Sequence, residues 1–279
     1  MITFDHIDNG NAFDFGRISE DYTKYRDIYP DVFYQKIHDL GLCRKGQQVL
    51  DLGTGTGVLP RQLVKYGAKF IGADISENQI ALARKLSEGM NIEYIVSPAE
   101  EVDFHDGTFD TVLACMCFTY FDKAILLPRL YRMIKDDGHL AIMSLIHLPG
   151  ESSIAKGSEE LVLKYNQSWN GAGYTRPSFD SNGIPTSYKV DTSLGFEVAT
   201  SFAFDVSLLF TRETWHGRIK ATRAIGASSL TQEQIALFER EHWGFMEKQP
   251  ESFEILHSAT FCVLKKNTEI TKPKSEPKV

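Results

Sequence analysis

Residues 49–57 read VLDLGTGTG, and the pattern around this stretch decides the fold. Residues 48–52 form a short apolar run that predicts a buried strand, and the three glycines that follow allow a sharp turn and a close backbone approach to a ligand. Residues 58–66 can continue as a helix that ends at Gly67. Residues 69–73 predict a second strand, followed by an acid. This order predicts the mononucleotide-binding half of a doubly wound sheet.

The spacing of the glycines and two acids indicates the ligand. Dinucleotide-binding folds use G-x-G-x-x-G and place a pyrophosphate on a helix N-terminus, whereas this chain has D-x-G-x-G-x-G. Asp51, beside the turn, suits a ligand with a cationic ammonium group. Asp74 suits a ribose, because a carboxylate can accept hydrogen bonds from both hydroxyls. S-adenosylmethionine joins an amino acid to a ribose, so we expect it as the cofactor and S-adenosylhomocysteine as its product.

The same stretch resembles motifs I and II of the class I S-adenosylmethionine-dependent methyltransferases, in the branch of the ubiquinone-type and trans-aconitate enzymes. The resemblance covers residues 22–147. It implies an α/β fold with a doubly wound, mostly parallel seven-stranded sheet of the Rossmann-like methyltransferase type, to which this chain would add a helical cap. Around the turn and the second strand it implies cofactor contacts from Asp51, Gly53, Thr54, Gly55, Asp74, Ile75 and Gln79.

The segment ahead of the first strand is dense in tyrosine and arginine. Residues 22–30 resemble the Y-x-x-x-R-x-x-Y-P segment of methyltransferases like trans-aconitate methyltransferase, in which this segment covers the bound cofactor. The resemblance implies cofactor contacts from Tyr22 and Arg26, with residues 1–47 forming a lid and a lead-in helix. The alternative is an amphipathic helix whose tyrosines pack on the domain.

Residues 99–110 are similar to the A-E-x-L-P-F-x-D-x-S-F-D pattern of the ubiquinone-type branch. In that branch the loop surrounds the adenine, so the resemblance implies contacts from Ala99 and Glu100. The family pattern has an aspartate before the alanine, where this chain has Pro98. Either Glu100 or a backbone carbonyl would then contact the adenine amino group.

The fourth strand is predicted over residues 109–117, with Cys115 and Cys117 on one face as small core residues. Residues 118–122, FTYFD, follow it and resemble the H-W-F-D segment of the trans-aconitate group. Because ligands bind at the carboxyl ends of strands in open α/β sheets, we expect Cys115 and Tyr120 beside the cofactor. The alternative for these aromatic residues is a rim of the core.

Apolar runs and capping residues predict the other elements. Ser76 with Gln79, and Thr231 with Gln234, are spaced as capping boxes. Residues 136–138 predict a turn before the fifth strand. The further predicted helices cover residues 31–40, 76–86, 128–134, 154–167, 211–223 and 231–245, and the further strands cover residues 92–97, 140–146, 196–210 and 257–264.

These elements predict a division of the chain into a core and a cap. The cofactor-binding core is expected over residues 48–147 and its final strand over residues 251–266. Residues 148–250 are expected to form a substrate cap that includes strand six. Residues 267–279 hold Lys, Glu and Pro with few apolar residues and predict a disordered tail.

Composition argues against several classes of protein. There is no run of about 18 apolar residues, so no membrane span is expected, and the N-terminus lacks the features of a signal peptide. The net charge of −7 argues against a nucleic-acid substrate. The four cysteines are expected to be reduced, which gives a cytoplasmic location as the default, and the protein is expected to be a monomer or a homodimer.

The predicted helix over residues 211–223 carries candidate substrate residues. His216 is a candidate base, and Arg218 or Arg223 is a candidate clamp for a carboxylate. A solvated basic helix face is the alternative. Helical spacing puts His216, Lys220 and Arg223 on one face, and Trp215, Arg218, Ile219 and Thr222 on another. His242 and His257 complete a possible histidine set, but nothing fixes a metal geometry and no metal is expected.

We therefore expect a methyltransferase that acts on a small and possibly anionic molecule. The anion is suggested by a concentration of Arg176, Arg212, Arg218, Lys220 and Arg223 in the cap, near Trp169, Tyr174 and Trp215. The alternatives are an RNA or protein methyltransferase, a nucleotide-binding dehydrogenase, and a non-catalytic S-adenosylmethionine-binding protein. The acceptor atom (O, N, S or C), the use of a general base and the oligomeric state stay open.

Overall fold

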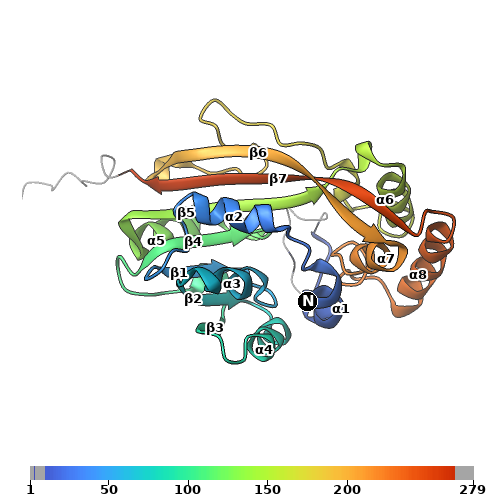
Figure 1. The fold of residues 1–279 in the computed structure, drawn as a ribbon, viewed down its shortest axis with the longest axis horizontal. Helices are drawn as coiled ribbons and strands as arrows, with labels where there is room; N and C mark the ends of the chain where they lie inside the picture. Colours follow the sequence, from blue (N-terminus) through green and yellow to red (C-terminus); the bar gives the residue numbers. More distant parts are fainter. Residues whose placement is uncertain (1–2, 4–9, 268–279) are drawn as a thin grey trace, which may run out of the picture.

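The computed structural model describes residue 3 and residues 10–267 of the chain. Its strands are β1 (Gln48–Leu52), β2 (Lys69–Asp74), β3 (Ile92–Val96), β4 (Phe109–Cys115), β5 (Ile134–His147), β6 (Phe196–Thr211) and β7 (Ser252–Lys266). They form one sheet in the order β3-β2-β1-β4-β5-β7-β6. Strands β1 to β5 are parallel, and β7 runs antiparallel between β5 and β6 (Figure 1). The expected doubly wound, mostly parallel seven-stranded sheet is confirmed, with a mixed edge.

Helices cover both faces of this sheet. Leu63 of α3 packs against the face that carries Val49, whereas Leu130 of α5 packs against the face that carries Leu50. Neighbouring residues of β1 thus point to opposite faces and are both buried, as expected for a strand covered by helices on both sides. The helices are α1 (Ser19–Arg26), α2 (Asp31–Asp39), α3 (Val58–Leu63), α4 (Glu77–Leu86), α5 (Lys123–Met133), α6 (Ser153–Tyr165), α7 (Arg212–Lys220) and α8 (Gln232–Met246).

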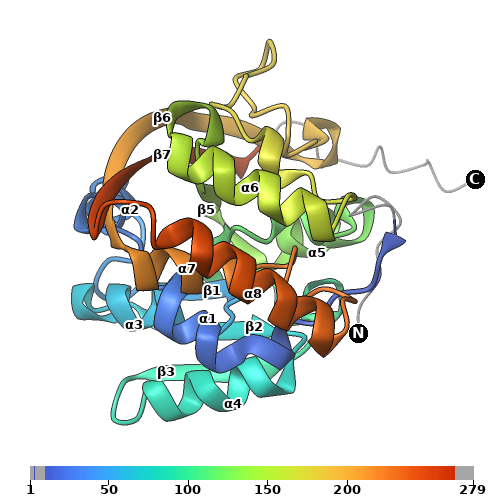
Figure 2. The same ribbon diagram turned by 90° about the vertical axis from the view of Figure 1, so that its right-hand side faces the viewer.

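Helices α6, α7 and α8 gather at one end of the molecule, beside α1 (Figures 1 and 2). They share a core of their own, in which Trp215 and Phe238 are fully buried. The long strands β6 and β7 reach into it and contribute Phe210 and Ile255. The helices of the expected cap thus stand on extensions of the main sheet.

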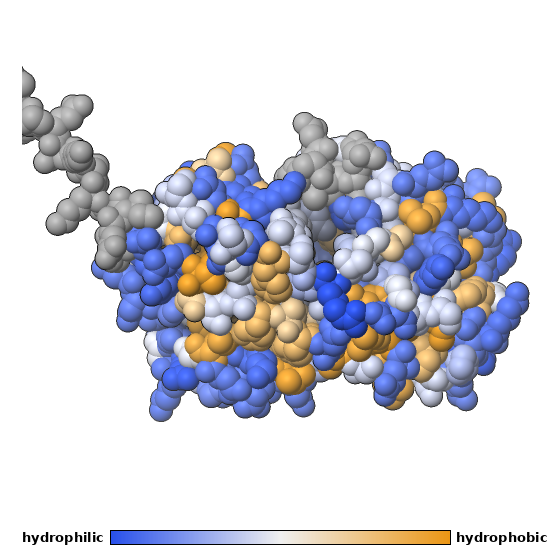
Figure 3. Space-filling view, turned by 90° about the horizontal axis from the view of Figure 1, so that it is seen from above, coloured by the Kyte–Doolittle hydropathy of each residue, from blue (hydrophilic) through white to orange (hydrophobic). Residues whose placement is uncertain are grey.

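Strand β6 is the edge of the sheet at the top of Figure 1. Its residues alternate between half-buried and exposed along the strand from residue 202 to residue 209. Viewed from above, the molecule shows hydrophobic residues among hydrophilic ones (Figure 3). Over the described residues, no helix is long and apolar enough to cross a membrane. The expected disordered tail lies outside the described residues, apart from Asn267.

The predicted start of a helix at Pro128 is wrong, because α5 begins five residues earlier, at Lys123. The carboxylate of Asp122 accepts hydrogen bonds from the backbone N–H groups of Ala124 and Ile125. These bonds satisfy donors that a helix end otherwise leaves unpaired, and they fix the start of the helix. Pro128 then lies inside the helix, where it removes one backbone donor.

The predicted extent of the fourth and fifth strands is also corrected. Strand β4 ends at Cys115, and Met116 has a positive φ of 61°, so Cys117 does not share a strand face with Cys115. Strand β5 begins at Ile134, and the predicted turn at residues 136–138 lies inside it. Phe109 of β4 pairs with Ile134 of β5, and the next paired residues are Thr111 and His139. Two residues of β4 thus match five residues of β5, and the additional β5 residues form a bulge.

The predicted basic face of α7 does not exist, because the helix ends at Lys220 and Arg223 lies beyond it. The chain turns back on the helix end, where Gly226 donates its backbone N–H to the carbonyl of Lys220. A β-carbon on Gly226 would lie 2.7 Å from that carbonyl oxygen, so only glycine fits this close approach. The predicted helix ended at Arg223, three residues after the observed end at Lys220.

Candidate cofactor and acceptor site

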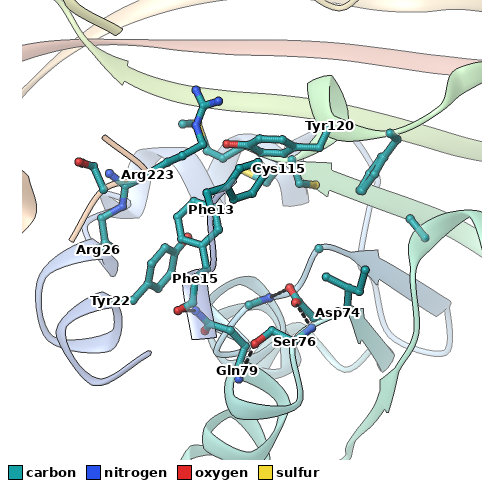
Figure 4. A pocket seen from close by; sticks show the side chains of 18 of the residues that line it. Phe13, Phe15, Tyr22, Arg26, Asp74, Ser76, Gln79, Cys115, Tyr120 and Arg223 are labelled. Atoms are coloured by element: carbon teal, nitrogen blue, oxygen red, sulfur yellow. Dashed lines mark hydrogen bonds between the residues drawn. The ribbon is translucent and has the colours of Figure 1, made fainter. Parts of the chain in front are cut away.

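A cavity of about 190 Å³ opens at the carboxyl ends of the parallel strands, between the sheet, the N-terminal segment and the cap (Figure 4). All predicted cofactor residues except Asp51 and Thr54 line it. Of the three predicted substrate residues, Arg218 and Arg223 line it and His216 does not. The lining residues predicted from the sequence are Tyr22, Arg26, Gly53, Gly55, Asp74, Ile75, Gln79, Ala99, Glu100, Cys115, Tyr120, Arg218 and Arg223.

The glycine-rich turn forms one wall of the cavity. Gly53 and Gly55 have positive φ angles of 59° and 57°, which favour glycine. A β-carbon on Gly53 would lie 2.7 Å from Cβ of Cys117, so the turn packs closely against the residues that follow β4. The backbone of the turn therefore faces the cavity without side chains in between.

The carboxylate of Asp74 joins this turn to the end of β2. One oxygen accepts a 2.9 Å hydrogen bond from the backbone N–H of Gly55, and the other accepts one of the same length from Ser76. Figure 4 shows these bonds at the floor of the cavity. A carboxylate has about four acceptor positions, so each oxygen can still accept a hydrogen bond from a ribose hydroxyl.

Asp51 is not among the residues that line the cavity, and its expected contact with an ammonium group stays a prediction. Its side chain is 2% exposed, and its carboxylate accepts a 2.6 Å hydrogen bond from the hydroxyl of Thr54. Burial raises the pKa of Asp51 to about 7, against the opposing effect of the Thr54 hydrogen bond. Asp51 thus supports the turn through its hydrogen bond with Thr54.

The N-terminal segment forms the opposite wall and includes residues that the sequence analysis missed. Phe13, Asp14 and Phe15 line the cavity, and Figure 4 shows Phe13 near Tyr120. The segment is fixed at both sides: Asp14 donates its backbone N–H to the carbonyl of Ala227, and Gln79 donates its side-chain amide to the carbonyl of Phe15. The sequence feature that could have predicted this wall is the pair of phenylalanines ahead of the tyrosine-rich stretch.

The bond from Gln79 to the N-terminal segment also corrects a predicted cap. Ser76 does accept a hydrogen bond from the backbone of Gln79, which is one half of a capping box. The other half is absent, because the Ser76 N–H donates to Asp74 and the Gln79 amide donates to Phe15. At Thr231 and Gln234 both halves are present.

Helix α1 contributes one tyrosine to the cavity and turns the next away from it. Tyr22 lines the cavity beside Phe15, and the guanidinium of Arg26 lies 5.5 Å from the centre of its ring. Tyr25 instead packs on α7, where a β-carbon on Gly217 would lie 2.5 Å from its ring. The expected lid therefore rests directly on the cap.

The loop after β3 contributes the predicted adenine-side residues. Pro98, Ala99 and Glu100 line the cavity, and Glu100 accepts a 2.7 Å hydrogen bond from the backbone N–H of Asp122. One oxygen of Glu100 thus supports the start of α5. Both expected contacts with the adenine amino group, from Glu100 or from a backbone carbonyl, stay predictions.

Arg218 is the most unusual charged group in the cavity. It is 4% exposed, and no carboxylate in the described part of the chain lies within 4 Å of its guanidinium. Its Nε has no hydrogen-bond partner, and its closest polar contact is Nε2 of His257 at 3.5 Å. Burial and then the charge of Arg26 lower the pKa of Arg218 to about 9. A buried charge without a partner is costly, so this guanidinium suits an anion in the cavity.

A buried histidine with a carboxylate partner lines the same end of the cavity. Nε2 of His147, the last residue of β5, lies 2.7 Å from an oxygen of Glu159 on α6. The other oxygen of Glu159 accepts a 2.6 Å hydrogen bond from the indole of Trp169. His147 and Trp169 line the cavity, and His147 and Glu159 are buried. No sequence motif links these residues, and the sequence analysis named neither His147 nor Glu159.

The predicted base, His216, lies on the other side of α7. Its Nδ1 is 2.8 Å from Nδ1 of His242, whose Nε2 contacts the hydroxyl of Ser158. Burial lowers the pKa of His242 to about 3 and that of His257 to about 2, so both are neutral at pH 7. No group of His, Cys, Asp or Glu among the described residues could hold a metal ion.

Most of the other predicted cap cations pair with carboxylates or with backbone carbonyls. Arg176 pairs with Glu151 and Asp205, and Lys220 pairs with Asp21 and Glu239. Arg212 donates to backbone carbonyls that follow α8. The second predicted helix face is divided between two environments. Trp215 and Ile219 pack in the cap core, whereas Arg218 and Thr222 line the cavity.

A second cavity of about 440 Å³ adjoins the first. Tyr120, Tyr174 and Arg223 are among the residues that line both, so the two cavities share a wall. The guanidinium of Arg223 lies 5.4 Å from the ring centre of Tyr120 and 5.1 Å from that of Trp169. Lys123 and Lys189 also line the second cavity, and none of its lining residues is acidic.

Comparisons with known proteins agree with this geometry. Residues 50–142 match a family model described as a methyltransferase domain. A candidate methyltransferase of Dictyostelium discoideum is 32% identical over 47% of this chain and 48% of its own length. A demethylmenaquinone methyltransferase of Thermus thermophilus is 34% identical over 38% of this chain and 50% of its own length. The chain thus spans about half the length of these curated relatives.

The fold is shared with a solved structure of a candidate methyltransferase from Bacillus halodurans C-125. The two superpose with a TM-score of 0.53 at 19% sequence identity, over 84% of this chain and 99% of the other. The matched domain spans the glycine turn, Asp74 and the loop after β3, and its cofactor is S-adenosylmethionine. The match over residues 50–142 and these relatives support the expected resemblance to the class I S-adenosylmethionine-dependent methyltransferases.

Proposed function

We propose that the protein transfers the methyl group of S-adenosylmethionine to a small, anionic acceptor. The observation that carries the proposal is the arrangement of the cavity. The glycine turn and Asp74 line one side, and the buried guanidinium of Arg218 lines the other. The demethylmenaquinone methyltransferase that the chain resembles acts, by its name, on a small molecule, which supports a small-molecule acceptor but says nothing of its charge.

The residues present fit the cofactor. Asp74 has acceptor positions left for two ribose hydroxyls, and the glycine backbone permits close approach of the amino-acid part. The bound cofactor supplies a methyl group that its sulfonium already activates. The protein then contributes orientation and the exclusion of water, through Tyr22, Phe13 and Phe15 on the open side.

Arg26 and Arg218 line the cavity from different elements, and each suits one anionic group. Arg26, on the lid helix, suits the carboxylate of the cofactor. Arg218, on the cap, suits an anionic group of the acceptor. The second cavity offers room for the rest of the acceptor beside the shared wall, and its lysines favour the same sign of charge.

The test is binding followed by turnover. Calorimetry should show S-adenosylmethionine and S-adenosylhomocysteine binding at micromolar Kd, or roughly 8 kcal/mol, and no comparable binding of NAD. The protein should transfer radiolabelled methyl from S-adenosylmethionine to small acids in a protein-free metabolite extract. Tight binding with no transfer to the extract would favour the non-catalytic alternative. Label found only in added RNA or protein would favour a macromolecular substrate.

A further inference from the structure

We propose that His147 is the general base of the methyl transfer and that Glu159 positions it. The acceptor atom would then be an oxygen, sulfur or nitrogen that loses a proton when it is methylated. This inference rests on the proposed function and narrows its substrate class. It is carried by the placement, the bonding and the electrostatic surroundings of one histidine.

The position of His147 follows from the sheet. Strand β5 lies next to β4, and the carboxyl ends of these parallel strands meet at the cavity, where Cys115 ends β4 and His147 ends β5. The glycine turn follows β1, on the far side of β4. His147 is therefore on the side of the cavity away from the ribose-binding Asp74 and close to the cap. This is the side on which Arg218 would hold the acceptor.

The bonds of Glu159 determine which nitrogen of His147 is available. The indole of Trp169 can only donate, and it occupies one oxygen of Glu159. An ionised Glu159 accepts at its other oxygen, so Nε2 of His147 carries the hydrogen and donates it. Nδ1 then has a lone pair, and no residue in the described part of the chain hydrogen-bonds to it. A ligand in the cavity can therefore donate a hydrogen bond to Nδ1.

The charged surroundings favour a neutral ring that can accept a proton. Burial lowers the pKa of His147, and the hydrogen bond that His147 donates to Glu159 on α6 opposes this shift. Arg218 on α7 and Arg26 on α1 lower it further. The neighbouring rings of His257, Tyr174 and Trp215 lie 5.4 to 6.2 Å from the imidazole. The base is thus neutral at pH 7, and the cation that it forms lies beside the Glu159 carboxylate.

The step balances without any further reactant. The acceptor X–H gives its proton to Nδ1 of His147, and the electron pair of that bond stays on X. X then attacks the methyl carbon in line with the bond from carbon to sulfur. That bond breaks with its electron pair on sulfur, so the cationic sulfonium becomes the neutral thioether S-adenosylhomocysteine. The proton on His147 leaves to solvent after the methylated acceptor departs.

Two substitutions separate a base from a structural histidine. In Glu159→Gln the amide can donate to Nε2 of His147, which forces the hydrogen onto Nδ1 and removes the lone pair from the cavity side. In His147→Gln the base is lost. His216→Gln is the matched control, because His216 is a half-buried histidine of the cap that does not line the cavity.

The first experiment needs no acceptor. Nitrogen-15 NMR of histidine-labelled protein with S-adenosylhomocysteine should show His147 neutral at pH 7 with its hydrogen on Nε2, and Glu159→Gln should move the hydrogen to Nδ1. A hydrogen on Nδ1 in the unaltered protein, or a cationic ring at pH 7, would overturn the proposal. Calorimetry with S-adenosylhomocysteine checks that each variant is folded, and the Kd should stay within about twofold.

The second experiment measures transfer of labelled methyl to a matched panel of 3,4-dihydroxybenzoate, 3-mercaptobenzoate, 3-aminobenzoate and benzoate, together with the metabolite extract. The unaltered protein should methylate acceptors that have a proton to lose, with kcat/KM rising as His147 loses its proton. His147→Gln should lower kcat by about 100- to 10,000-fold, the range for a lost general base, and should abolish this pH dependence. His216→Gln should change neither.

The outcomes distinguish the inference from the function on which it rests. No transfer by the unaltered protein to the panel or to the extract would overturn the proposed function and, with it, the base. Transfer that is equal in the unaltered protein and in a folded His147→Gln variant would leave the function intact and make His147 structural. Transfer to benzoate alone would also reject the base, because a carboxylate has no proton to lose at pH 7.

Discussion

The hydroxyl of Thr54 donates a 2.6 Å hydrogen bond to the buried carboxylate of Asp51, directly behind the glycine turn. Burial nonetheless raises the pKa of Asp51 to about 7. The folded protein therefore binds this proton more tightly than the unfolded chain does. The contribution to the free energy of unfolding is highest below about pH 4 and is lost as the pH rises through about 7.

Asp51→Asn should flatten this pH dependence. The amide keeps an acceptor for Thr54 but does not ionise, so a loss of stability that totals about 4 kcal/mol between pH 4 and 7 should disappear. Urea denaturation of the cofactor-free protein at several pH values measures it. Asp137→Asn, at an exposed position, is the control and should keep the slope. An unchanged slope in Asp51→Asn would show that Asp51 is ionised in the folded protein at low pH.

Asp74→Ala should weaken both cofactor binding and the fold. Loss of charge-assisted hydrogen bonds to the ribose should cost roughly 1.5–3 kcal/mol of S-adenosylhomocysteine binding. In the folded protein the carboxylate also accepts hydrogen bonds from the backbone N–H groups of Gly55 and Ser76. We therefore expect a lower Tm as well. Calorimetry and thermal denaturation measure the two effects, with exposed Glu77→Ala as the control, and unchanged cofactor affinity would remove Asp74 from the site.

The N-terminal segment should close on the cofactor. Hydrogen exchange of residues 15–26 should slow when S-adenosylhomocysteine binds, because Tyr22 and Phe15 line the cavity. Gly217→Ala should reverse part of this protection, since its β-carbon would lie 2.5 Å from the ring of Tyr25 and push α1 off the cap. Equal and high protection in the free protein would mean that the segment is structural and does not act as a lid.

Arg218→Met should stabilise the cofactor-free protein and impair the reaction. Methionine replaces a buried, unpaired guanidinium with an apolar chain of similar length, so the free energy of unfolding should rise. The variant lacks the guanidinium that would bind the anionic group of the acceptor, so kcat/KM should fall 10- to 100-fold. This fall corresponds to a loss of roughly 1.4–2.8 kcal/mol of transition-state stabilisation. Arg240→Met, on the exposed side of α8, is the control. Full activity in Arg218→Met would place the anion elsewhere.

Local sequence determined the cofactor half of the site. The strand, the glycine turn and the acid at the end of β2 all lie within residues 48–74, so the geometry of one strand–helix–strand unit places them relative to one another. This is why Gly53, Gly55 and Asp74 line the cavity as expected. The same holds for Thr231 and Gln234, whose capping box depends on residues three positions apart.

The acceptor half of the site was decided by the tertiary structure. Glu159 meets His147 because α6 folds back over the end of β5, and Trp169 completes the pair from a loop. Helical spacing favoured His216 instead, which faces His242. A periodic pattern states which residues share a face, but only the packing of α7 against its neighbours decides which face is open. The sequence thus determined what the protein binds as cofactor, and the packing of the cap determined which side chains reach the acceptor.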